Sequence, residues 1–123
     1  MNRRSIRIAF ALVAVVSGVA GCSSDGSSSG VPGATFTVHA KDNNKFDKAQ
    51  YRATTGPLTI GYKNDGQLLH TLLIEGHPEF KLAVGKNQPS TSGAVTLAPG
   101  TYTLFCDVPG HRQDGMVAEL SVQ

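Results

Sequence analysis

From residue 34 onward, apolar side chains recur at every second position, which is the spacing of a strand with one buried face. The segments that carry this pattern are rich in Thr, Val, Tyr and Phe, and turn-forming Gly, Pro, Asn and Asp separate them. Their apolar positions are Phe36, Val38 and Ala40; Leu58, Ile60 and Tyr62; Leu72 and Ile74; Val95 and Leu97; Tyr102 and Leu104; and Ala118, Leu120 and Val122. The pattern predicts an all-β fold, an antiparallel Greek-key β-sandwich.

Two stretches of this part of the chain have no clear period. Residues 42–50 are polar and compatible with a helical turn, and residues 78–92 favour no particular element. His39 alternates with the apolar positions of its strand and His77 falls in a turn, so we expect both at the surface.

The first 21 residues have the layout of an export signal. Arg3, Arg4 and Arg7 precede an apolar run over residues 8–16, which is far shorter than the ~20 residues of a membrane-spanning helix. Val19-Ala20-Gly21-Cys22 resembles a bacterial lipobox, in which the Cys becomes the first mature residue and carries the lipid. An ordinary cleaved secretory signal is the alternative, and the paired arginines leave the export route open.

These features divide the chain into three parts. We expect a lipoprotein signal peptide over residues 1–21, a lipid-anchored flexible Ser/Gly linker over 22–33, and one domain over 34–123. The protein would then be an exported bacterial lipoprotein on the outer face of the cytoplasmic membrane or the periplasmic side.

The net charge of +2 is positive only because the signal contributes three arginines. Without its three arginines, the eleven basic residues become eight, against nine acidic ones. A mature chain with a net charge of −1 has no electrostatic footprint for nucleic acid, so we expect no nucleic-acid partner. We expect a monomer.

The two cysteines of the chain are expected to have separate roles. Two cysteines in an exported protein would ordinarily suggest a disulfide. Cys22 is assigned to the lipobox, however, which leaves Cys106 as a lone thiol in an oxidising compartment. A metal ligand is a good reason to keep such a thiol.

The segment from Cys106 to Met116 carries the candidate chemistry. It places a Cys at a strand end, His111 in the loop and a Met where the next strand begins. His70 is the best candidate for a second histidine, and two His, one Cys and a weak axial Met form a copper donor set. Three of these side chains are in phase with the apolar face of their strands and therefore point inward, namely His70, Cys106 and Met116.

The spacing Cys-x₄-His-x₄-Met resembles the copper loop of the cupredoxins, the small type 1 blue-copper proteins of the plastocyanin, azurin and rusticyanin kind. Asn64-Asp-Gly66 before His70 and the run from Leu97 to Cys106 are also similar to that family, so the resemblance covers residues 34–123. It implies one copper ion per chain, cycling between Cu(I) and Cu(II), with His70, Cys106 and His111 as strong ligands and Met116 as the axial one.

The resemblance also implies roles for neighbouring residues. Thr71 would brace the ligand loops, and its backbone N–H would donate to the Cys106 sulfur. His111 would lie near the surface, within an apolar patch to which Val108 and Pro109 contribute, and would serve as the electron port.

We therefore expect a one-electron carrier that serves a redox donor and an acceptor. The alternative is a copper carrier that delivers the metal outside the cytoplasm. We do not expect an enzyme: the chain has no His-x-His pair for a second copper site, and nothing supplies an oxyanion site for a catalytic cysteine. The loop also lacks the second Cys of a dinuclear electron-transfer site.

Overall fold

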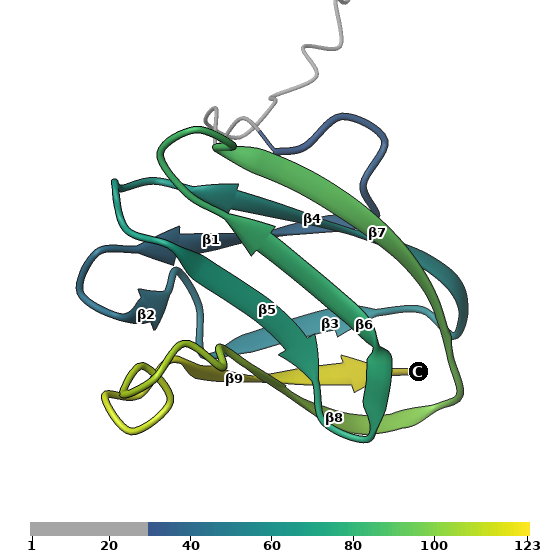
Figure 1. The fold of residues 1–123 in the computed structure, drawn as a ribbon. Coiled ribbons are helices and arrows are strands. Elements are labelled where there is room, and N and C mark those ends of the chain that lie inside the picture. The colour runs from purple at the N-terminus through teal and green to yellow at the C-terminus, as the bar shows by residue number, and fades with distance from the viewer. Residues whose placement is uncertain (1–29) are drawn as a thin grey trace, which may run out of the picture.

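The computed structural model describes residues 30–123, which form two β-sheets packed face to face (Figure 1). One sheet has the order β2-β1-β4-β7 and the other the order β3-β9-β8-β5-β6. In chain order, the strands are β1 (Phe36–Lys41), β2 (Lys45–Phe46), β3 (Gln50–Ala53), β4 (Gly56–Asn64), β5 (His70–Ile74), β6 (His77–Val84), β7 (Ser90–Leu97), β8 (Gly100–Phe105) and β9 (Val117–Val122). The predicted all-β sandwich is confirmed.

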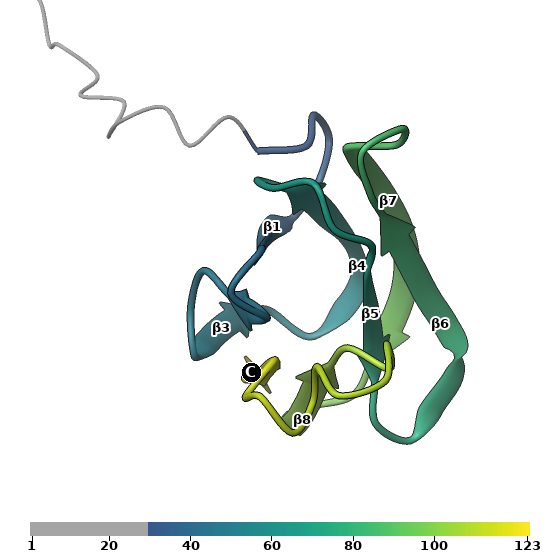
Figure 2. The same ribbon diagram turned by 60° about the vertical axis from the view of Figure 1, so that its left-hand side comes forward.

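The chain changes sheet several times, as the turned view makes clear (Figure 2). Strands β5 and β6 are antiparallel neighbours, β7 contacts β6 from the other sheet, and β8 returns to pair with β5. A fourth strand that returns beside the first is the Greek-key arrangement.

Most strand pairs are antiparallel, as an antiparallel sandwich requires, but two pairs are parallel. Strand β1 runs parallel to β4, and β3 runs parallel to β9. A parallel pair needs a crossover connection, and the chain makes one between β1 and β4 when it passes to the other sheet as β3 and comes back.

The core lies between the sheets and follows the period of two. All the inward positions expected from the sequence are buried or packed against the buried cluster. The fully buried members include Ile60, Tyr62, Leu72, Leu104 and Leu120.

The first strand and the polar stretch after it differ from expectation. His39 is only 8% exposed, because the N–H of Asp65 donates to Ala40 and brings the Asp65 carboxylate to within 3.0 Å of His39 Nδ1. Residues 42–50 contain a turn, the short strand β2 and the start of β3, and no helix. Residues 78–92 belong largely to β6 and β7, while His77 begins β6 and is partly exposed.

The substitution Leu104→Ala should lower the free energy of unfolding by about 2–5 kcal/mol, because it opens a cavity at a fully buried position. Urea denaturation of the metal-free protein measures this loss. Leu69→Ala is the control, since Leu69 is 59% exposed and its truncation should change stability by at most about 0.5 kcal/mol. Equal losses in the two variants would contradict the assigned core.

Candidate metal centre

Strand pairing brings three distant parts of the sequence to one end of the sandwich. Strand β8 pairs with β5 on one side and with β9 on the other, both antiparallel. The start of β5, the end of β8 and the start of β9 therefore lie at the same end of the sheet. His70 is the first residue of β5, Cys106 follows β8, and Met116 precedes β9.

The loop from Cys106 to Met116 is closed by its own backbone. The N–H of Cys106 donates to the carbonyl of Met116 at 3.2 Å, and the N–H of Met116 donates to the carbonyl of His111 at 3.0 Å. Gly110 and Gly115 have φ values of 86° and 101°, which side-chain-bearing residues rarely adopt. The loop therefore holds its Cys, His and Met in a defined backbone shape.

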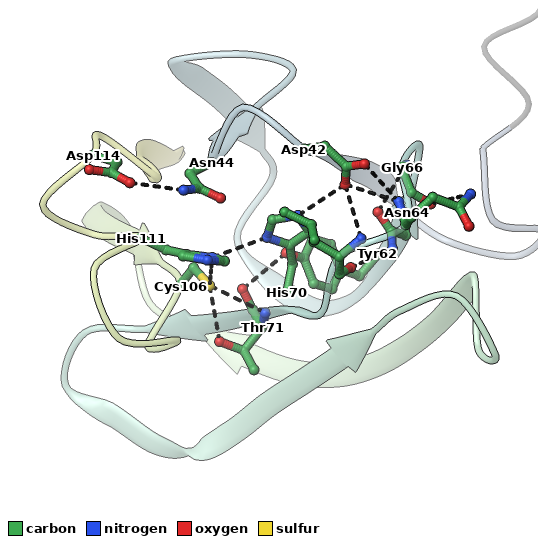
Figure 3. A network of polar contacts seen from close by, with 12 residues as sticks. Asp42, Asn44, Tyr62, Asn64, Gly66, His70, Thr71, Cys106, His111 and Asp114 are labelled. Carbon is green, nitrogen blue, oxygen red and sulfur yellow. Dashed lines mark hydrogen bonds and ion pairs between the residues drawn. The ribbon is translucent and has the colours of Figure 1, made fainter.

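Three ligand side chains converge in this region (Figure 3). The Nδ1 atoms of His70 and His111 lie 3.3 Å apart, and the Cys106 sulfur lies 3.6 Å from His111 Nδ1. The three potential ligand atoms are all within 4.8 Å of one another. His70, Cys106 and Met116 are fully buried, whereas His111 is partly exposed.

The chemistry of these side chains suits copper. Two imidazole nitrogens and a sulfur turned toward one another offer a shared position for one ion, and Met116 completes a donor set typical of a type 1 copper site. Burial and the neighbouring His111 lower the pKa of His70, so its imidazole is neutral at neutral pH. Neutral imidazole is the form that binds a metal.

Thr71 connects the two ligand segments at the sulfur. Its backbone N–H donates a hydrogen bond to the Cys106 sulfur, with 3.4 Å between nitrogen and sulfur. Its hydroxyl donates to the Asp107 carboxylate at 2.6 Å and accepts from the Asp107 N–H at 2.9 Å. Thr71 therefore ties the start of β5 to the residue after Cys106. The buried Tyr62 adds a hydrogen bond from its hydroxyl to the Thr71 carbonyl.

Sequence reasoning missed Asp107 and Lys81 as parts of this network. Lys81 Nζ lies 2.7 Å from the second oxygen of the Asp107 carboxylate. The hydrogen bonds from Lys81 and Thr71 hold the pKa of Asp107 below its usual value. The position of Asp107 directly after Cys106 was the available signal, whereas Lys81 is brought there only by the pairing of β6 with β5.

Asp42 and Asn44 were also missed. Both lie in the turn between β1 and β2, and each reaches a different ligand segment. Asn44 donates from its side chain to Asp114 at 2.8 Å, within the loop that carries His111. Asp42 accepts from the backbone N–H groups of Leu68 and Gln67, which lower its pKa. No local sequence signal connects this turn to the ligands.

The export features fall outside the described residues. These are the signal over residues 1–21 and the expected lipid attachment at Cys22. Residues 30–123 contain no helix long and apolar enough to cross a membrane.

Comparison by sequence finds no matching family model and no matching curated protein. Comparison by structure finds many similar chains. A dithionite-reduced auracyanin from the photosynthetic bacterium Roseiflexus castenholzii has a TM-score of 0.62 at 21% identity, with 71% of this chain and 94% of that one covered. The blue copper protein auracyanin A from Chloroflexus aurantiacus has a TM-score of 0.57 at 20% identity, covering 72% and 98% of the chains. Oxidised plastocyanin from Dryopteris crassirhizoma has a TM-score of 0.56 at 21% identity, covering 71% and 99%.

These likenesses define the class of fold. The protein is a cupredoxin-like two-sheet β-sandwich that resembles auracyanin and plastocyanin. At one end it brings together His70, Cys106 and His111. Met116 is buried, and its carbonyl accepts a hydrogen bond from the N–H of Cys106.

Replacing Thr71 by Val should lower the free energy of unfolding by about 1–3 kcal/mol, since the Asp107 N–H and one carboxylate oxygen lose their partner in a half-buried position. Chemical denaturation of the metal-free protein gives the value. Thr96→Val on the exposed side of β7 makes the same chemical change and should stay within about 0.5 kcal/mol of the wild type. A Thr71→Val protein as stable as the Thr96→Val control would refute the bracing role.

Proposed function

We propose that this protein carries single electrons on one copper ion held by His70, Cys106, His111 and Met116. The observation that carries the proposal is the convergence of two Nδ1 atoms and one thiol sulfur at a buried end of a cupredoxin-like sandwich. Bound copper would supply one-electron chemistry by alternating between Cu(I) and Cu(II).

The chain's own residues would keep the site the same in both states. Cys106 and Met116 provide soft sulfur ligands and the histidines provide nitrogen ligands, a combination acceptable to both oxidation states. The closed loop and the Thr71 network restrain these side chains before any metal arrives. Full burial of His70, Cys106 and Met116 excludes water from the ion. A site that changes little on electron transfer has a small reorganisation cost.

His111 is the natural route for the electron. It is the one proposed ligand that is partly exposed. Exposed apolar side chains adjoin both histidines: Leu69 precedes His70, and Pro109 lies two residues before His111. These apolar side chains would offer a redox donor and acceptor a contact surface beside the exposed ligand.

Burial of the ligands also argues against the copper-delivery alternative. A delivery protein must release its ion to a partner, and three fully buried ligands slow such an exchange. Transfer of copper to a chelator distinguishes the two functions: an electron carrier retains the ion for hours, and a delivery protein gives it up within the time of mixing.

The purified protein loaded with Cu(II) should show an intense visible absorption band from the Cys106 thiolate, bleached by ascorbate and restored by reoxidation. Cys106→Ser should abolish the band because it removes the thiolate ligand. His77→Gln is the matched control, since His77 lies in β6 outside the site, and should leave the band unchanged. A folded wild-type protein without the band would refute the copper proposal.

We further propose that Cys22 anchors the protein to a membrane. Its support is the lipobox-like Val19-Ala20-Gly21-Cys22 after a basic start and an apolar run. Confinement to a surface raises the frequency of encounters with redox partners in the same membrane. One lipid chain alone binds only marginally, so the anchor would carry more than one chain or be helped by other contacts.

Cys22→Ser should move the protein from the membrane fraction to the soluble fraction of a bacterial host, while Cys106→Ser should remain in the membrane. Immunoblots of the two fractions provide the measurement. Wild-type protein in the soluble fraction would instead indicate an ordinary cleaved secretory signal.

A further inference from the structure

The buried ring of His70 has one nitrogen without a hydrogen-bond partner. Its Nδ1 faces His111 and Cys106, but its Nε2 is buried and makes no hydrogen bond. A buried polar atom without a partner carries a free-energy cost. An acceptor near Nε2 would remove that cost and favour the ring form that carries its proton on Nε2. The Asp42 carboxylate lies close by, with its Oδ1 3.8 Å from Nε2.

The Asp42 carboxylate is held at this position from the other side. Its Oδ1 accepts from the backbone N–H groups of Gln67 and Leu68, each at 3.0 Å, and its Oδ2 accepts from Gln67 at 2.9 Å. These amides belong to the segment that leads directly into His70, so the carboxylate and the ring are parts of one small assembly (Figure 3).

Gly66 leaves the space that the carboxylate occupies. A Cβ atom at Gly66 would lie 2.0 Å from Asp42 Oδ1, so no other residue fits there without displacing the carboxylate. At 3.8 Å the two atoms are too far apart for a hydrogen bond, which forms only when they approach to ~3.0 Å.

We propose that Asp42 is a positioning residue for His70: its carboxylate accepts a hydrogen bond from Nε2–H, which leaves Nδ1 without a proton and free to bind the metal. A neutral imidazole carries its single proton on either nitrogen, and the hydrogen-bond partner decides which. With the proton on Nε2, His70 Nδ1 is an acceptor, and it then accepts from His111 Nδ1 at 3.3 Å in the metal-free protein. The two facing nitrogens cannot both carry a proton at that distance.

The same carboxylate would also bias the redox state. A negative charge behind the ring raises the basicity of the ligand and stabilises the more highly charged Cu(II). This second consequence rests on the proposed copper function, whereas the position of the proton does not.

The first test therefore uses metal-free protein. Long-range ¹H–¹⁵N spectra of the histidine rings at a pH where His70 is neutral show which nitrogen is protonated. In the wild type we expect His70 to carry its proton on Nε2, and in Asp42→Ala we expect part of the population to shift to Nδ1. Asp65→Ala is the matched control, because Asp65 pairs with His39, which is not a proposed ligand, and it should leave His70 unchanged.

A wild-type His70 with its proton on Nδ1 overturns the proposal, and so does an Asp42→Ala spectrum in which His70 is unchanged. The wild-type measurement needs no variant, so it decides the matter even if Asp42→Ala fails to fold.

The second test uses the copper-loaded protein and compares Asp42→Asn with Asp65→Asn. Each variant removes one carboxylate charge. Only Asp42→Asn removes a charge that lies beside the His70 ring. We expect Asp42→Asn to weaken Cu(II) binding relative to Cu(I) by about tenfold, a rise of ~59 mV in the reduction potential. Equal shifts of the reduction potential in the two variants would mean that the loss of any negative charge has this effect. That result would overturn the redox role of Asp42. Failure to bind copper would refute the proposed function while leaving the proton position to be judged by the first test.

Discussion

The candidate centre depends on the hydrogen-bonded pairing of β8 with β5 on one side and β9 on the other. Each pair is antiparallel, so the end of β8 and the starts of both neighbours lie at the same end of the sheet. His70, Cys106 and Met116 occupy those three positions. Because side chains alternate between faces along a strand, a slip of one residue in either pair would turn a ligand to the outside of the sandwich. The register that buries Leu72, Leu104 and Leu120 is thus the register that assembles the ligands.

A polar network adjoins the ligands at Thr71, the residue after His70. Thr71 bonds with Asp107, Asp107 pairs with Lys81, and the Tyr62 hydroxyl donates to the Thr71 carbonyl. Thr71 and Tyr62 are buried and would be costly without partners, so their hydrogen bonds restrain them, whereas the Asp107–Lys81 ion pair lies at the surface. These bonds hold Thr71 and Asp107, the residues next to His70 and Cys106, in place without a metal ion.

The turn between β1 and β2 adds a contact with each ligand segment. Asp42 holds the amides before His70, and Asn44 bonds with Asp114 in the loop that carries His111. The turn belongs to the opposite sheet from the ligands. It therefore links the packing of the two sheets to the geometry of the centre. A shift of one sheet against the other would move the two ligand segments.

Sequence reasoning succeeded where burial alternates without interruption. The inward positions of β4, β5, β8 and β9 and the sandwich itself follow from the period of two. It failed at His39, whose outward side is covered by Asp65 of a different loop, and at residues 42–50, whose polar composition does not distinguish a helical turn from a short edge strand. The two parallel pairs were also missed, because a period of two indicates which face of a strand is buried and not which strand it pairs with.

The amino-acid sequence by itself determined the class of fold, the inward phase of the candidate ligands and the types of donor atom, because side-chain alternation and ligand chemistry are local properties. Only the tertiary structure decided that His70 Nδ1 faces His111 and the Cys106 sulfur, that Lys81 reaches Asp107, and that Asp42 lies behind His70. These contacts join residues that are from 26 to 41 positions apart. No local pattern encodes them, since they arise when separate strands and loops pack together.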